Sequence, residues 1–405
     1  MKAQRVIHNG FRDSVELSHE SLKVVINADK GMVPELCSKK DDSWYNAHWQ
    51  PIFRANSGIA WDETLHAPFW KVPLLYDIAG NFPCCPNFGP DHTFGSYELP
   101  PHGHTSLLTW DLLGSAADEQ QAGASWSLQS PDHPFSYKKH DLICKGEHSH
   151  YTSLTITNRG NTTEPYNCGW HNTIGAPFLE SGCIISNNAR RFAVPEVGTE
   201  FDTTGRLAFG SETDTMKRVE TRTGEYVDLS VVPGRNGYTD FLVGAVPEDC
   251  SLGWSTVVNP RKRLMYLTYF TGPNAVKEGE MPLYFYNYWM NYGGRPFQPW
   301  AAYEGGTDNS FCLGTENSVS RFANGLKDSV ENPTLLGHPT HLDLAPQSSI
   351  TLNYATAFLP YEGALFDDGV KHIEAEDEDT LIIHNHHGAH MRVQSQAGFK
   401  ALREV

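Results

Sequence analysis

Short stretches of alternating apolar and polar residues recur along most of this 405-residue chain, separated by turns rich in glycine and proline. Residues 151–158 (YTSLTITN) place Leu154 and Ile156 on one face and polar side chains on the other, as in a half-buried strand. The same pattern returns in residues 264–270, 283–289 and 350–358. No stretch keeps a 3.6-residue period over the length of a helix. The pattern therefore predicts an all-β protein built from large antiparallel sheets.

The C-terminal segment has a different composition from the rest of the chain. An acidic run at residues 374–379 precedes a stretch that carries His384, His386, His387 and His390. No cysteine or carboxylate completes a standard metal-ligand spacing with these histidines, so we expect a solvated tail and no metal. We expect one β domain over residues 1–364 and an acidic, histidine-rich extension over residues 365–405.

The charge of the chain excludes several classes of partner. The chain has 31 Lys and Arg against 48 Asp and Glu, which gives a formal charge of −17. A surface this acidic repels nucleic acid and anionic membranes. No apolar run is long enough to span a membrane, and the N-terminus has no apolar signal segment. The eight cysteines are scattered, so we expect reduced thiols and a cytoplasmic location.

Three segments, taken in chain order, resemble the galactose mutarotase-like superfamily, which includes the aldose 1-epimerases and hexose-phosphate 1-epimerases. His102-Gly103 follows a loop rich in proline and glycine, as in the family. A strand ending in Thr157-Asn158 turns into a segment that bears His171, and Glu304 comes later in PWAAYEGGTD. The resemblance covers roughly residues 15–360. It implies a supersandwich of large antiparallel sheets and an enzyme without a cofactor that acts on a small-molecule sugar.

The activity that the resemblance implies is the interconversion of sugar anomers. This reaction needs a base for the C1 hydroxyl and an acid for the ring oxygen, each with its pKa tuned towards the working pH. Glu304 is the expected base, because its apolar neighbours would raise the pKa of its carboxyl. His171 is the expected acid, because an imidazole can change charge between pH 5 and 8.

Other residues are expected to hold the sugar. His102 would bind a hydroxyl or the ring oxygen, with His104 two residues on along the same strand face. Asp240 matches the family's hydroxyl-binding aspartate more loosely, and Asn81 lies in the proline- and glycine-rich loop. Tyr284 and Tyr286 alternate onto one strand face, where aromatic rings would stack on a pyranose, although packing in the core is an alternative for them.

The sequence departs from the phosphate-binding branch of the family at two positions. That branch has arginines where this chain has Ala79 and Ser106. A doubly charged phosphate needs such bidentate partners, so we expect an unphosphorylated sugar or sugar derivative.

Two other functions remain open from the sequence. A glycoside hydrolase or lyase can share this scaffold, because a fold does not fix a function, but a hydrolase needs a second carboxylate beside the first. A non-catalytic sugar-binding or sensing protein would use the same groups only as hydrogen-bond partners. The sequence names neither the sugar nor the oligomeric state.

Overall fold

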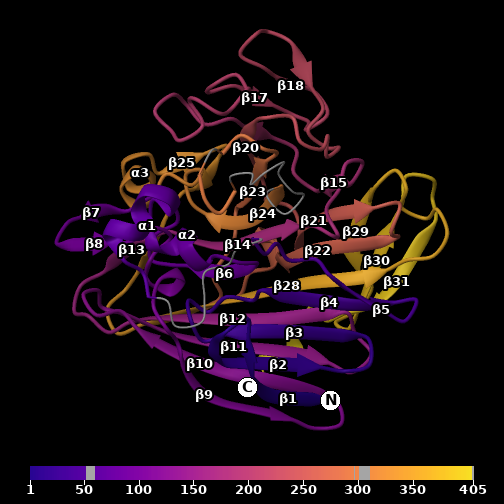
Figure 1. Cartoon of the computed structure of the whole chain (residues 1–405), viewed down its shortest axis with the longest axis horizontal. Coiled ribbons are helices and arrows are strands. Elements are labelled where there is room, and N and C mark those ends of the chain that lie inside the picture. The colour runs from indigo at the N-terminus through magenta and orange to yellow at the C-terminus, as the bar shows by residue number, and fades with distance from the viewer. Residues whose placement is uncertain (52–59, 296, 301–310, 404–405) are drawn as a thin grey trace.

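Two large antiparallel sheets lie face to face at the centre of the molecule (Figure 1). The computed structural model describes residues 1–51, 60–295, 297–300 and 311–403. The all-β prediction is confirmed, since helices are short and few in these ranges. The helices are α1 (Glu63–Trp70), α2 (Pro73–Asp77), α3 (Leu326–Glu331), α4 (Lys400–Arg403) and the 3₁₀ turns η1 (His104–Ser106) and η2 (Pro273–Ala275).

The larger sheet has eight strands, and all its neighbouring strands pair antiparallel. In spatial order they are β15 (Ile184–Asn187), β21 (Leu252–Asn259), β22 (Leu264–Thr271), β28 (Ser349–Pro360), β12 (Ser149–Asn158), β11 (Phe135–Cys144), β10 (Gln121–Gln129) and β9 (Asp111–Ala117). The central strands β12, β22 and β28 include the segments whose alternation predicted strands.

The second sheet has seven strands and carries the candidate site. In spatial order they are β17 (Glu212–Thr213), β16 (Phe192–Ala193), β20 (Thr239–Ala245), β23 (Phe285–Asn291), β24 (Cys312–Val319), β14 (Cys168–Gly175) and β6 (Asn81–Cys84). Its inner face packs on the eight-stranded sheet through a core that includes Trp126 and Tyr137 from one side and Tyr286 and Tyr288 from the other. Fully burying an aliphatic or phenylalanine side chain in such a core stabilises the fold by about 1.5–3 kcal/mol.

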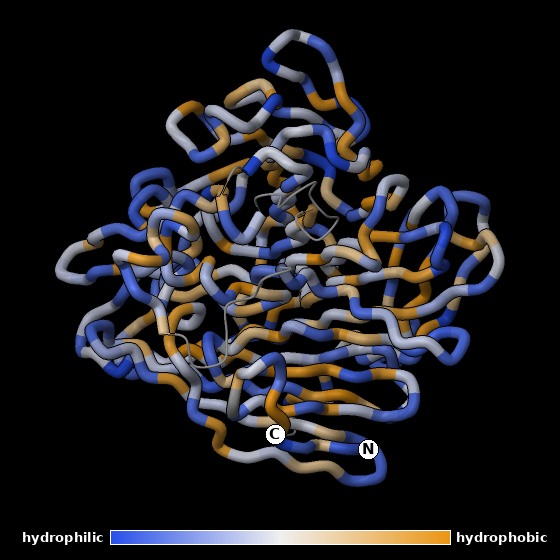
Figure 2. The backbone as a smooth tube through the Cα atoms, viewed as in Figure 1, coloured by the Kyte–Doolittle hydropathy of each residue, from blue (hydrophilic) through white to orange (hydrophobic). Residues whose placement is uncertain are grey.

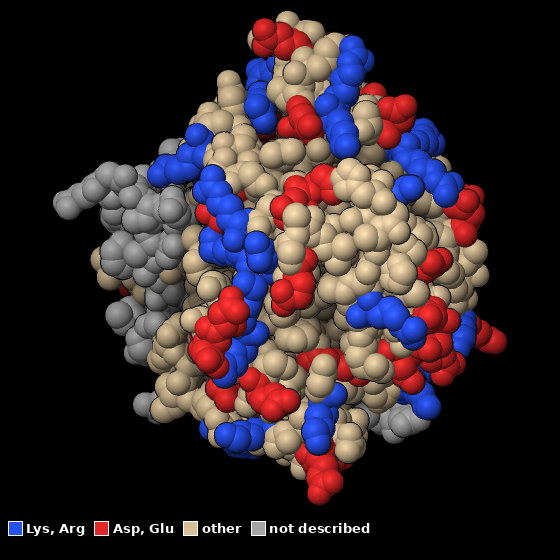
Figure 3. Space-filling model, turned by 90° about the vertical axis from the view of Figure 1, so that its right-hand side faces the viewer, with Lys and Arg blue, Asp and Glu red and all other residues tan. Residues whose placement is uncertain are grey.

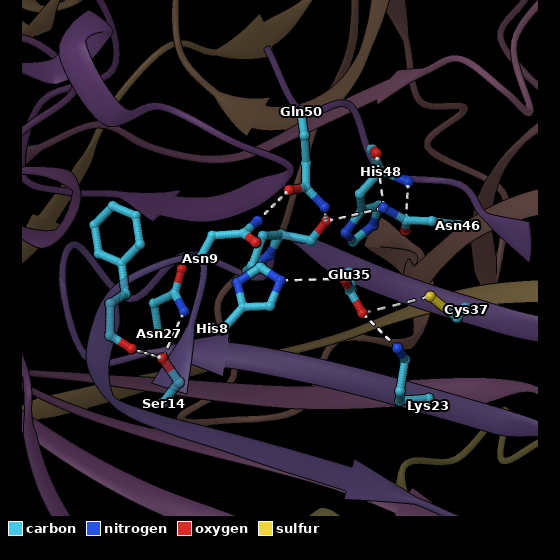
Figure 4. A network of polar contacts seen from close by, with 12 residues as sticks. His8, Asn9, Ser14, Lys23, Asn27, Glu35, Cys37, Asn46, His48 and Gln50 are labelled. Carbon is cyan, nitrogen blue, oxygen red and sulfur yellow. Dashed lines mark hydrogen bonds and ion pairs between the residues drawn. The ribbon is translucent and has the colours of Figure 1, made fainter. Parts of the chain in front are cut away.

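A five-stranded sheet formed by the N-terminus covers one side of the larger sheet. Its strands are β1 (Lys2–His8), β2 (Phe11–Ser18), β3 (Leu22–Asn27), β4 (Glu35–Lys40) and β5 (Ser43–Asn46). Glu35 joins three of these strands, because its carboxylate binds His8 at 3.1 Å and Lys23 at 2.7 Å (Figure 4). Burial would raise the pKa of Glu35, but these two partners lower it to about 2.

The C-terminal segment packs on the outer face of the eight-stranded sheet. It forms the sheet β29 (His372–Ala375), β30 (Thr380–His384) and β31 (His390–Gln394). Leu381, Ile383 and Phe399 are fully buried against side chains such as Trp254 and Tyr269. The expectation of a solvated tail is therefore wrong, because alternate residues of this segment are apolar and face the larger sheet.

Four two-stranded sheets complete the described structure. They are β7 (His92–Phe94) with β8 (Tyr97–Leu99), β13 (Glu164–Tyr166) with β27 (Leu342–Leu344), β18 (Val219–Glu220) with β19 (Tyr226–Val227), and β25 (Thr334–Leu335) with β26 (His338–Pro339).

Hydropathy and charge follow this layered arrangement. Hydrophobic residues gather in the stacked strands, whereas the projecting loops are mostly hydrophilic (Figure 2). Acidic and basic side chains lie beside one another on the face that Figure 3 presents. All eight cysteines have free thiols, and seven of them are buried. Among the described helices, none has both the length and the apolar character to cross a membrane.

Candidate functional site

A cavity of about 560 Å³ opens on the face of the seven-stranded sheet that points away from the larger sheet. This size is in the usual range for small-molecule sites. Strands β14, β20, β23 and β24 form its floor, and loops that include Gly89–Asp91 and Gly198–Phe201 form its rim. Its aromatic lining residues are Trp49, Phe201, Phe241, Trp289, Phe297 and Trp300.

A histidine and a glutamate meet on the floor of the cavity. His171 is on β14 and Glu316 is on the adjacent strand β24, and both side chains point to the cavity side of the sheet. The distance from His171 Nε2 to Glu316 Oε1 is 3.1 Å. The other ring nitrogen of His171 lies 3.2 Å from Thr173 Oγ1, and the ring of Phe82 stacks on the imidazole at 4.5 Å between centroids. These contacts fix the orientation of the imidazole.

Burial determines the charge of this pair. Desolvation lowers the pKa of His171 well below its ordinary value, and neighbouring His102 lowers it further. Desolvation also raises the pKa of Glu316 well above its ordinary value, and the charge of Glu200 adds to the effect. Both shifts favour neutral groups, because a buried charge loses its hydration. The pair therefore holds one shared proton, which these two shifts favour on Glu316.

His102 reaches the cavity from a tight turn. Its backbone is left-handed, with φ of 56°, and its N–H donates to the Gly89 carbonyl at 2.8 Å. Gly103 follows with φ of +78°, and a Cβ there would lie 2.3 Å from the Cys85 carbonyl oxygen. The turn places the His102 ring 5.2 Å from that of His171. Burial lowers the pKa of His102 to about 4, so this imidazole is neutral at pH 7.

A cation and an anion face each other across the cavity wall. The Arg295 guanidinium lies over three rings, at 5.1 Å from Trp289, 5.4 Å from Phe297 and 5.0 Å from Trp300. It pairs with the Glu200 carboxylate from the rim. Because aromatic faces attract cations, the three rings hold the guanidinium in place.

The predicted site residues divide between this cavity and other places. His102 and His171 both line the cavity. Glu304 lies outside the described residues. His104 binds Ser130 Oγ at 3.1 Å and is not a lining residue. The predicted strand face shared by His102 and His104 is wrong, because Gly103 turns the chain and a 3₁₀ turn begins at His104.

Asp240 and Asn81 are buried in polar contacts of their own. Asp240 accepts a hydrogen bond from Arg206 Nε at 2.7 Å. The Asn81 amide oxygen accepts the indole N–H of Trp170, which points into the core between the two large sheets. Neither residue lines the described cavity.

The tyrosine face of β23 points away from the cavity. Tyr286 is fully buried in the core between the sheets, and Tyr284 stacks on His338 at 5.1 Å between ring centroids. Strand alternation places Trp289 on the opposite face, where it lines the cavity. The alternation was predicted, but the tyrosines pack in the core, the alternative stated for them, and do not face the cavity.

Sequence reasoning missed Glu316, Arg295 and Glu200. A signal for Glu316 exists, because it is the one acidic or basic residue within CLGTENSV, a segment otherwise fit for a fully buried strand. A charged residue in such a segment is expected to be paired or functional. Arg295 and Glu200 lie in loops, where no periodicity indicates the direction of a side chain.

Comparison with solved structures identifies the fold. A candidate aldose 1-epimerase from Klebsiella pneumoniae aligns with a TM-score of 0.60 at 13% identity, over 88% of this chain and 83% of that chain. A galactose mutarotase related enzyme from Lactobacillus acidophilus aligns with a TM-score of 0.52 at 11% identity, over 85% and 97%. A galactose mutarotase-like protein from Clostridium acetobutylicum aligns with a TM-score of 0.50 at 11% identity, over 89% and 98%.

The sequence itself matches no protein-family model and no curated protein. The fold is galactose mutarotase-like, and the supersandwich expected from the sequence is confirmed.

Proposed function

We propose that this protein is an aldose 1-epimerase-like enzyme that interconverts the anomers of an unphosphorylated sugar or sugar derivative. The observation that carries the proposal is the contact of His171 with Glu316, 3.1 Å long, on the floor of an aromatic cavity. The galactose mutarotase-like fold supports it, and several proteins that share the fold are named for this activity.

The reaction uses the one proton that the pair holds. The C1 hydroxyl oxygen and the ring oxygen of a pyranose are bonded to the same carbon, so adjacent groups can serve both. Glu316 takes the proton of the C1 hydroxyl while the His171 imidazolium protonates the ring oxygen, and the bond from C1 to the ring oxygen breaks. The pair then holds its proton on Glu316. Rotation about the bond between C1 and C2 followed by the reverse transfers closes the ring as the other anomer.

The starting charge arrangement requires the proton to move within the pair. Burial favours the neutral form of both groups, with the proton on Glu316. Transfer of that proton to His171 across the 3.1 Å contact gives the carboxylate and the imidazolium that ring opening needs. Neutral His102, 5.2 Å from His171 between ring centroids, is placed to hydrogen-bond a sugar oxygen without adding a charge.

The surroundings of the pair suit an unphosphorylated sugar. The aromatic wall offers faces on which the C–H side of a pyranose can stack. Ser106, at a position where the phosphate-binding branch has arginine, is buried, and its hydroxyl donates to the His102 carbonyl at 2.9 Å. Ala79 is also fully buried. Neither position presents a cation to a ligand.

Saturation-transfer NMR on free aldoses, uronic acids and hexose phosphates tests this function. We expect the protein to speed anomer exchange of at least one unphosphorylated sugar above its spontaneous rate. Absence of acceleration on every sugar would contradict the proposal, and a preference for hexose phosphates would contradict the inference from Ala79 and Ser106.

A glycoside hydrolase is the second candidate, and one observation favours it. Glu200 lines the same cavity as Glu316, and its charge helps to raise the pKa of Glu316, so two carboxyl groups flank the space. Hydrolases use such a pair as acid and as base or nucleophile. Release of the aglycone from aryl glycosides by the wild type, absent in Glu316→Gln, would establish this activity instead.

A further inference from the structure

We propose that the sugar carries a carboxylate and that Arg295 binds this carboxylate in exchange for Glu200. The inference names the substrate class of the proposed function and rests on it for the sugar part of the ligand. It rests on the surroundings of Arg295, on the position of Glu200, and on the other charges that line the cavity.

Arg295 is a largely buried cation that is held in a fixed position, unlike an arginine on the open surface. Its side chain is only 12% exposed, and the three rings of Trp289, Phe297 and Trp300 surround its guanidinium. Its Nε–H is buried and has no hydrogen-bond partner among the described residues, and the same holds for the indole N–H of Trp289. Both residues line the cavity, so two unused donors are present at one wall. Buried donors without an acceptor are rare, and a ligand oxygen would satisfy them.

Glu200 occupies the place that a ligand carboxylate would take. Its side chain is 53% exposed and extends from the rim, whereas Arg295 is held in the wall. Its charge acts on the pKa of both His102 and Glu316, so the carboxylate lies close to the groups proposed to hold and open the sugar. The protein therefore already places one carboxylate on Arg295, and a ligand carboxylate can take over the guanidinium when the half-exposed Glu200 side chain turns to solvent.

The remaining charges favour a carboxylate over a phosphate. Among the described residues, Lys71 is the other Lys or Arg that lines the cavity, with its ammonium 5.9 Å from the centre of the Phe297 ring. Asp91 and Asp328 also line the cavity; Asp328 is paired with Arg321 at 3.1 Å, so the added negative charge comes from Asp91 and Glu200. One guanidinium fork matches one carboxylate, whereas a dianion would meet these acidic groups with fewer cations than it needs.

Isothermal titration calorimetry with matched sugars tests the inference. Galacturonate and galactose differ only at C6, and galactose 6-phosphate supplies the dianion. We expect galacturonate to bind at least about tenfold more tightly than galactose, because a hydrogen bond to a charged group is among the stronger ones. Arg295→Met should abolish this preference, and Arg190→Met, which removes a cation 71% exposed at another site, should leave it intact.

Glu200→Gln is the second variant, and it should raise the affinity for galacturonate that Arg295→Met lowers. Removing the competing carboxylate should tighten galacturonate binding and change galactose binding less. Equal affinity for galacturonate and galactose in the wild type would overturn the inference, as would tightest binding of the phosphate. Anomer exchange is measured separately on the same samples. If galactose exchange is accelerated but galacturonate is not preferred, the proposed function stands and this inference is wrong. If galacturonate binds in an Arg295-dependent way but no sugar shows accelerated exchange, the carboxylate site stands and the proposed function is wrong.

Discussion

His171 and Glu316 lie on neighbouring strands with Nε2 and Oε1 3.1 Å apart, on the side of the sheet that faces the cavity. The neighbouring residues on both strands hold the two large sheets together. Asn172 and Asn317, on the opposite face, each make a hydrogen bond with the Tyr354 hydroxyl inside the core. The same two strands thus anchor the sandwich on one side and position the pair on the other, which ties the geometry of the site to the core.

The first prediction concerns the pH profile of anomer exchange. The active pair holds one proton, so activity is lost when a second proton binds at low pH and when the only proton leaves at high pH. Burial lowers the pKa of His171 and raises that of Glu316, which moves the two limits apart. We expect a bell-shaped rate profile with its acid limb below the ordinary histidine value of about 6.5.

The rate of exchange measured by NMR from pH 4 to pH 9 checks this profile. An acid limb centred above pH 7 would mean that the acid and base are not this buried pair.

The second prediction concerns the turn that presents His102. Gly103→Ala adds a Cβ that would lie 2.3 Å from the Cys85 carbonyl oxygen, at a residue with φ of +78°. Strain and the clash should together lower the free energy of unfolding by more than about 2 kcal/mol. Gly95→Ala is the matched control, because Gly95 has φ of +60° but nothing within 4 Å of the added Cβ. Gly95→Ala should lower the free energy of unfolding by only about 1 kcal/mol.

Urea denaturation of both variants measures the difference. Equal losses would show that the close approach to Cys85 does not constrain the turn.

The third prediction concerns stability in acid. Burial lowers the pKa of His48 and His133 to about 3 and that of His148 to about 4. Between these values and about 6.5 the unfolded chain binds protons that the folded chain does not. Their contribution to stability is therefore complete above pH 6.5 and is lost as the pH falls towards 3. We expect the free energy of unfolding, measured in urea, to fall steadily from pH 6.5 to pH 4.

Glu147 supplies a variant that opposes this trend. Burial raises the pKa of its carboxyl to about 7, so the folded chain holds a proton that the unfolded chain releases between about pH 4.5 and 7. This group stabilises the fold as the pH falls through that range. Glu147→Gln should steepen the loss of stability by up to about 1.4 kcal/mol per pH unit. A slope unchanged by the substitution would contradict the assigned pKa.

The strand pattern was readable from the sequence because alternation reports which residues face a core. It predicted the all-β class and the segments that became β12, β22 and β28. It did not say which face of β23 meets the core, because Tyr286 and Trp289 are both large and apolar enough for either side. The C-terminal segment was wrongly predicted to be solvated because most of its residues are acidic, histidine or otherwise polar. The apolar residues among them, including Leu381 and Ile383, are enough to pack the segment against the larger sheet.

The sequence predicted only those residues of the candidate site that stand in local motifs. His102 and His171 stand in short motifs that can be read locally, and both line the cavity. Glu316 has no such motif, and its role depends on which strand lies beside β14. That neighbour is set by pairing between segments about 140 residues apart, which no local pattern encodes.

The most direct test of the central claim is anomer exchange by saturation-transfer NMR on the best sugar from the panel, comparing wild type, Glu316→Gln and His171→Asn. Each substitution should reduce the rate about 10²- to 10⁴-fold while circular dichroism stays unchanged. Glu164→Gln, a carboxyl bound to Tyr97 away from the cavity, should keep the wild-type rate. Full exchange in Glu316→Gln, together with loss in Glu304→Gln, would contradict the account and transfer the base to Glu304.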